Sequence, residues 1–161
     1  MDRDLAKLQK VSYFIGALAH GAEQNLGMGA LSFGMLAGKK FDIEVVSGIE
    51  QTSDPVKAVE VLRKALEKGI IWDFDPFMGG KSNLMEEENG VKRMRLVFRS
   101  CMVRNALFTY AHEQRQLLCY MSHGVFAGAM EKVMPNTAVK LEIVHAGPNA
   151  CLKELVWASK K

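Results

Sequence analysis

The sequence predicts an α+β domain: a mostly antiparallel sheet with helices packed on one face, preceded by a pair of N-terminal helices. Apolar residues recur every three or four positions in some segments, as in amphipathic helices, and alternate with polar residues in others, as in half-buried strands. The predicted order is helix, helix, strand, helix, strand, strand, helix, strand, strand. That order is typical of α+β domains.

The first 40 residues predict the helical pair. Apolar residues at helical spacing between Leu5 and Leu18 predict a helix over residues 3–21. A second helix is expected over residues 22–36, with Gly38 as its left-handed C-terminal cap. Glycines are costly inside a helix, so we expect those of the second helix at places where another element comes close to the backbone. They are Gly27, Gly29 and Gly34.

The other elements are predicted from the alternation of polar and apolar residues, from helix-capping residues and from residues that interrupt helices and strands. Asp54 and Pro55 predict the start of a third helix, and a fourth is expected over residues 117–134. In that last helix, Gly124 and Gly128 lie about one turn apart and should let another element approach. The polar segment 79–90 is predicted to be a loop. Strands are predicted over residues 41–46, 71–77, 91–99, 139–144 and 152–157.

Composition indicates one folded domain over residues 1–161, with 48% hydrophobic and 24% charged residues. The net charge of +3 is small and evenly spread, which argues against a nucleic-acid partner. No secretory signal is visible and no apolar run is long enough to span a membrane, so we expect a cytoplasmic protein. In that compartment the 3 cysteines favour metal binding over a disulfide framework.

Four residues of metal-binding type gather in the last third of the chain: Cys119, Glu142, His145 and Cys151. Zinc takes Cys, His and carboxylate ligands in a tetrahedron, so these residues could form a closed structural site that fastens the last helix to a hairpin. The alternative is that Glu142 is solvated, His145 lies at the surface and the two cysteines are small buried thiols. A second alternative pairs Cys119 with His123, one helical turn away, and with His112.

The residues from 118 onward resemble the 4-vinyl reductase domain family, also called hydrocarbon-binding proteins. The pattern is Cys119, Gly124, Ala127-Gly128, Glu142, His145, Gly147-Pro148-Asn149, Cys151. The family typically ends in Cys, a Gly-rich helix, Glu-x-x-Cys, a turn and a last Cys, and related sensor domains of phenol-responsive regulators bind zinc through such a set. The resemblance therefore implies a structural zinc on Cys119, Glu142, His145 and Cys151. His145 stands where the family more often has Cys, and the turn before Cys151 is shorter.

The resemblance also implies a cavity for a small apolar molecule, hydrocarbon-like or aromatic. Ordinary core packing is the alternative for the apolar residues that would line it. The expected walls come from the inner face of the sheet and the last helix: Trp72, Phe74, Met94, Leu96, Phe98, Met121, Val125 and Phe126.

We therefore expect a zinc-stabilised, non-catalytic binding module for a small apolar ligand. Sensing is one role for such a module. The apolar stripe from Leu5 to Leu18 favours a homodimer. Two alternatives stay open. One is an enzyme acting on a tetrapyrrole vinyl group, although the sequence has no dinucleotide-binding fingerprint. The other is a non-catalytic dimeric assembly scaffold.

Overall fold

The computed structural model describes residues 3–41, 48–68, 72–80, 82–101, 103 and 114–160. Within these ranges the chain forms four α-helices and five β-strands. In chain order they are α1 (Arg3–Leu26), α2 (Gly29–Lys40), α3 (Pro55–Lys68), β1 (Trp72–Pro76), β2 (Met85–Glu88), β3 (Val91–Cys101), α5 (Leu117–Val133), β4 (Thr137–Ala146) and β5 (Cys151–Ser159). Residues 42–46 of the first predicted strand lie outside the described residues.

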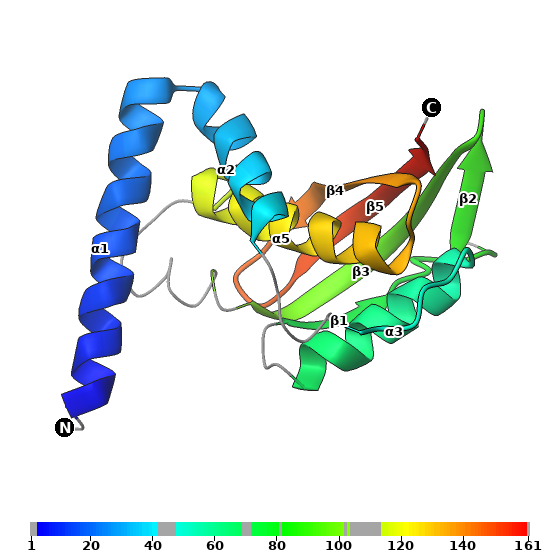
Figure 1. The fold of residues 1–161 in the computed structure, drawn as a ribbon, viewed down its shortest axis with the longest axis horizontal. Coiled ribbons are helices and arrows are strands. Elements are labelled where there is room, and N and C mark those ends of the chain that lie inside the picture. The colour runs from blue at the N-terminus through cyan, green and yellow to red at the C-terminus, as the bar shows by residue number, and fades with distance from the viewer. Residues whose placement is uncertain are drawn as a thin grey trace.

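The strands form one antiparallel sheet in the order β1-β3-β5-β4. β2 pairs with β3 as well, so β1 and β2 share one edge of that strand. Helices α3 and α5 lie against the same face of the sheet, whereas α1 stands at one end of the molecule (Figure 1). This arrangement confirms the predicted α+β class with helices on one face and an N-terminal helical pair.

Alternation along the strands decides which side chains enter the core. Met94, Leu96 and Phe98 of β3 are buried beneath the helices, whereas Arg93 and Arg95 point to the opposite face and reach Glu154 of β5. Because side chains of paired strands alternate in step, β1, β4 and β5 add their own apolar residues to the same inner face. These are Trp72, Phe74, Val139, Leu141, Leu155 and Trp157.

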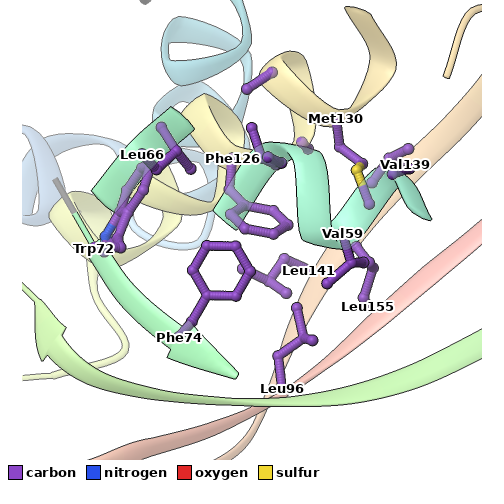
Figure 2. Close-up of a cluster of buried hydrophobic side chains, with 14 of the residues drawn as sticks. Val59, Leu66, Trp72, Phe74, Leu96, Phe126, Met130, Val139, Leu141 and Leu155 are labelled. Carbon is purple, nitrogen blue, oxygen red and sulfur yellow. The ribbon is translucent and has the colours of Figure 1, made fainter. Parts of the chain in front are cut away.

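An aromatic cluster fills the space between α5 and the sheet (Figure 2). The rings of Phe74 and Phe98 stack with their centroids 5.0 Å apart. The Phe126 ring of α5 meets both edge to face, at centroid distances of 5.3 and 5.6 Å. Such edge-to-face pairs add about 0.5–1.5 kcal/mol each beyond the burial of their area. The cluster therefore holds α5 in a fixed position on the sheet.

Helices α2 and α5 make the most extensive contact between any two of the described elements, and glycines make this contact possible. A Cβ atom added at Gly38 would lie 2.0 Å from the carbonyl oxygen of Met121, and one at Gly124 would lie 2.1 Å from that of Met35. Gly34 and Gly128 are similarly close to the backbone of the opposing helix, at 2.8 and 2.9 Å. The sequence-based expectation of close approach is therefore confirmed for Gly34, Gly124 and Gly128. It is wrong for Gly27 and Gly29, where an added Cβ would have no atom nearer than 3.9 Å.

An ion pair closes the far end of this helix crossing. Lys39 donates to Glu131 Oε1 at 2.6 Å, and the same oxygen accepts the amide of Val139 at 3.0 Å. Burial acts to raise the pKa of Glu131, but these hydrogen bonds outweigh it and hold the pKa below its ordinary value. The carboxylate thus ties α2, α5 and the start of β4 together.

Three other sequence-based expectations are wrong. The first helix does not end at Gly21 but continues to Leu26, and the chain turns at Gly27, whose φ of 52° suits glycine. Gly38 is not a cap, because it lies inside α2 at the crossing with α5. The predicted loop 79–90 contains strand β2, because pairing with β3 overrides its acidic, polar composition.

No helix among the described residues is long and apolar enough to cross a membrane.

The glycine crossing predicts opposite effects for two glycine-to-alanine substitutions. Gly38→Ala should lower the free energy of unfolding by about 2–3 kcal/mol, because its new methyl group collides with backbone that cannot move aside. Gly21→Ala is the matched control in α1, where nothing lies within 4 Å of an added Cβ. It should raise stability by about 0.5–1 kcal/mol. Urea unfolding of both variants measures the free energy of unfolding. Equal changes in the two variants would contradict the close crossing of α2 and α5.

Candidate ligand-binding site

A small cavity lies at the end of the sheet, between the first half of α5 and the strands β3, β4 and β5. Its volume is about 20 Å³, which is room for about one water-sized group. The lining side chains come from β3, the residues just before α5, α5 itself, β4 and β5: Cys101, Gln114, Arg115, Cys119, Ser122, His123, Ile143, Ala146, Cys151 and Lys153.

Helix spacing and strand register bring these residues together. Cys119, Ser122 and His123 are three and four positions apart, so they share one face of α5. In the sheet, Cys151 lies between Phe98 and Ala146, while Lys153 lies between Leu96 and Ile143. Residues paired across strands point to the same face, so Cys151 and Lys153 point toward the helices.

Lys153 occupies an inward position of β5, in phase with the buried residues Leu155 and Trp157. Its side chain is only 5% exposed. The ammonium nitrogen lies 4.4 Å from the centroid of the Phe98 ring, within range of a cation–π attraction. A cation thus borders the aromatic cluster at the edge of the cavity.

His123 is the most deeply buried polar residue of the cavity, with 1% of its surface exposed. Neither ring nitrogen has a hydrogen-bond partner among the described residues, and the ring lies beside that of Tyr120. Burial, reinforced by the positive charge of Lys153, lowers the pKa of His123 to about 2. The imidazole is therefore neutral near pH 7, with one N–H donor and one acceptor nitrogen unpaired.

The cysteines around the cavity are all thiols rather than disulfides. Burial raises the pKa of the Cys119 thiol, although a backbone hydrogen bond from Arg115 and the charge of Lys153 oppose the rise. Cys119 is therefore protonated near neutral pH. A buried thiol without an activating environment is a poor nucleophile, so this geometry does not favour cysteine catalysis.

The predicted metal ligands are divided between the two faces of the sheet. Cys119 and Cys151 line the cavity. Glu142 and His145 pair with Glu154 and Leu152, which point to the opposite face. The carboxylate of Glu142 binds Lys140 at 2.7 Å. As arranged here, the four residues do not fit a tetrahedral zinc site.

The described residues contain no group of three or more His, Cys, Asp or Glu side chains that could hold a metal ion. The zinc site on Cys119, Glu142, His145 and Cys151, called the zinc clip below, stays a prediction. It requires Glu142 and His145 to move toward the cavity. In the alternative set, His123 does share the cavity with Cys119, whereas His112 lies outside the described residues.

The predicted pocket walls form core in this structure. Trp72, Phe74, Met94, Leu96, Phe98 and Phe126 are fully buried and belong to one packed cluster. Met121 and Val125 lie at the crossing with α2. None of these eight residues lines the cavity. Their role in ligand binding stays a prediction.

Sequence reasoning missed Lys153 and treated His123 only as a rival metal ligand. One signal was present for Lys153: it interrupts the inward series of Cys151, Leu155 and Trp157 in the last strand. A lysine at an apolar phase of a strand indicates a buried charge, and buried charges are costly unless they are paired. No comparable signal marked His123, because its burial away from hydrogen-bond partners among the described residues results from tertiary packing.

Comparison with solved structures shows what class of fold this is. The chain is similar to the crystal structure of the phenol-responsive sensory domain of the transcription activator PoxR with phenol. The TM-score is 0.55 at 14% sequence identity, over 91% of this chain and 74% of that one. At that identity the similarity establishes the fold alone. No protein-family model matches the chain, and no curated protein matches its sequence. The resemblance to the 4-vinyl reductase family stays a hypothesis.

The zinc clip predicts about one zinc ion per purified chain, because four protein ligands make a closed structural site. Cys119→Ser and Cys151→Ser should then release the metal and lower the melting temperature. Cys101→Ser is the matched control, since Cys101 lines the same cavity but is not a predicted ligand. Metal analysis and thermal unfolding measure both effects. A folded wild-type protein without zinc would contradict the clip.

Proposed function

We propose that this chain is a non-catalytic binding module for a small aromatic molecule of the phenol kind. The observation that carries the proposal is His123, a neutral imidazole buried beside a cavity, whose ring nitrogens have no hydrogen-bond partner in the described part of the chain. A buried polar group without a partner costs about 1–3 kcal/mol, so a ligand that supplies the partner gains that free energy on binding. A phenol hydroxyl can both donate and accept a hydrogen bond, which matches a neutral imidazole.

The fold supports the same proposal. The similar sensory domain is described as phenol-responsive, and its structure was determined with phenol. Apolar pockets with a few polar groups are the usual sites for such ligands. Here the cavity adjoins the Phe98 ring through Lys153, so an aromatic ligand would meet apolar and aromatic surroundings beyond its hydroxyl. Zinc is not required for this mode of binding.

The cavity is smaller than a phenol ring, and this has a consequence for mechanism. A space of about 20 Å³ accepts the hydroxyl group, but the ring would have to displace side chains at the rim, such as Gln114 and Ile143. Ligand binding would therefore favour a conformation different from the closed one. A ligand that prefers one of two conformations shifts the population between them, which is the basis of sensing.

Replacing His123 separates ligand binding from stability. His123→Leu should weaken phenol binding about tenfold, because it removes the hydrogen-bonding partner. The same substitution should leave the melting temperature unchanged or raise it, since two unpaired polar atoms leave the core.

Isothermal titration calorimetry with phenol and thermal unfolding measure these two quantities. His145→Ala is the control, because His145 is exposed and belongs to the opposite face of the sheet. The His145→Ala substitution should change neither the affinity for phenol nor the melting temperature. Phenol binding that is unaffected by His123→Leu would place the ligand elsewhere, and failure of wild-type protein to bind phenol would overturn the proposed function.

The second part of the proposal is a homodimer formed through α1. This helix exposes Phe14 at 71% and Leu18 at 65% of their surfaces, with Leu8, Val11 and Ile15 also exposed. It contacts the rest of the chain near Ala19 and through Glu23, which accepts the amide of Leu117 at 2.9 Å. Extended apolar surfaces of this kind usually mark an interface. A second copy would cover the stripe by helix packing.

The double variant Phe14→Glu/Leu18→Glu should convert the dimer to a monomer, because two carboxylates one turn apart would be buried at the interface. Ser82→Glu adds negative charge at an exposed site far along the chain and serves as the control. Sedimentation velocity over a range of protein concentrations measures the outcome. A wild-type protein that stays monomeric throughout would disprove this interface.

A further inference from the structure

A groove with a volume of about 490 Å³ lies at the end of the sheet opposite the cavity beside His123. Cys151, at the start of β5, lines that cavity, whereas Trp157 and Ser159, near the end of the same strand, line the groove. The other walls are the residues before α3, the β2–β3 hairpin and the turn between α5 and β4 (Figure 1). Pockets for small molecules usually measure about 300–1,000 Å³. The groove therefore has the size of a second ligand site.

Backbone hydrogen bonds hold the walls of the groove together. The amide of Thr52 donates to the carbonyl oxygen of Val133 at 2.9 Å, which joins the segment before α3 to the end of α5. The amide of Lys160 donates to the carbonyl oxygen of Asn136 at 2.8 Å. Asn136 has a φ of 66°, in the left-handed region that asparagine adopts more readily than most residues. The groove is thus formed without a ligand, as small-molecule sites usually are.

Hydroxyl and carboxamide side chains converge on the groove. Thr137 and Ser159 lie opposite each other in the ladder between β4 and β5, so both hydroxyl groups are on one face of the sheet. Each hydroxyl or carboxamide group can both donate and accept a hydrogen bond. A ligand that carries several hydroxyl groups of its own matches such a lining. The six side chains are those of Gln51, Thr52, Ser53, Asn136, Thr137 and Ser159.

Trp157 forms a buried wall of the groove, with 4% of its surface exposed. Its indole N–H has no hydrogen-bond partner among the described residues. A buried tryptophan N–H usually has an acceptor, and a ligand oxygen that reaches the indole supplies one. Met134 and Pro135 add apolar surface to the same groove. This combination suits a sugar ring, which has polar hydroxyl groups and apolar C–H faces.

The charge on Lys92 favours a neutral ligand. Lys92 lines the groove and pairs with Glu87 across the β2–β3 hairpin, with 3.8 Å between the ammonium nitrogen and a carboxylate oxygen. An anionic ligand would compete with this carboxylate for the ammonium, whereas a neutral ligand leaves the ion pair intact.

We propose that this groove binds a neutral carbohydrate of one or two sugar units. The hydroxyl and carboxamide side chains bind the sugar hydroxyl groups, and the Trp157 indole donates to a sugar oxygen. The groove and the cavity beside His123 have no lining residue in common. The carbohydrate site is therefore independent of the proposed function, and either can fail without the other.

Tryptophan fluorescence tests carbohydrate binding directly. The chain has 2 tryptophans, so in the Trp72→Phe variant the emission comes from Trp157 in the groove wall. This variant is titrated separately with glucose, galactose, N-acetylglucosamine, maltose and cellobiose. At least one of them should change the emission in a saturable way. No saturable change with any of the five overturns the inference, and so does tighter binding of glucose 6-phosphate than of glucose.

Filling the groove should abolish binding. Ser159→Trp places a large side chain at the exposed end of β5, and isothermal titration calorimetry with the sugar that binds measures the loss. Ser82→Trp is the matched control, because Ser82 is also exposed but does not line the groove. It should leave the affinity unchanged. Sugar binding that survives Ser159→Trp overturns the inference.

Trp157→Phe tests the indole N–H. Loss of one neutral hydrogen bond should weaken sugar binding about three- to tenfold in calorimetry. Trp72→Phe is the matched control, because the Trp72 N–H also has no hydrogen-bond partner among the described residues, yet Trp72 does not line the groove. Equal affinities of the two variants would overturn the role given to Trp157. If Trp157→Phe does not fold, the comparison of Ser159→Trp with Ser82→Trp decides whether the groove is the site.

Discussion

The glycine-lined contact between α2 and α5 governs how the other elements pack. Gly38 and Gly124 bring the two backbones so close that no side chain fits between them. On its other side, α5 is held by Phe126, which meets the rings of Phe74 and Phe98. Helix α5 is therefore fixed between α2 and the sheet, and its position determines which of its residues face the sheet's end.

This fixed position creates the candidate site. The face of α5 that carries Cys119 and His123 is placed over the end of β5, where Cys151 and Lys153 point inward. The site differs from an apolar core because it buries an ammonium and an imidazole. No described residue makes a hydrogen bond to the imidazole. Such local costs are common at functional sites, where a ligand later supplies the missing interactions.

Much of the fold follows from local rules. The alternation of Met94, Leu96 and Phe98 with arginines predicted the central strand and its buried face correctly. The cap was equally local, since Asp54 accepts the amide of Val56 at 2.9 Å and begins α3. Strand β2 could not be recognised, because its residues Met85–Glu88 become a strand only through pairing with β3. Likewise, the residues around Gly38 do not show whether it ends a helix or lies where two helices cross.

For the site, the residue types and their phase are local properties of the chain: Cys119 and His123 share one helical face, and Cys151 and Lys153 share one strand face. Which of these residues meet depends on tertiary packing. The register of β4 puts Glu142 and His145 on the face away from Cys119, although spacing in sequence had grouped all four as zinc ligands. The physical reason is that sequence fixes the side on which a residue lies within its own element, whereas the distance between elements depends on packing over the whole core.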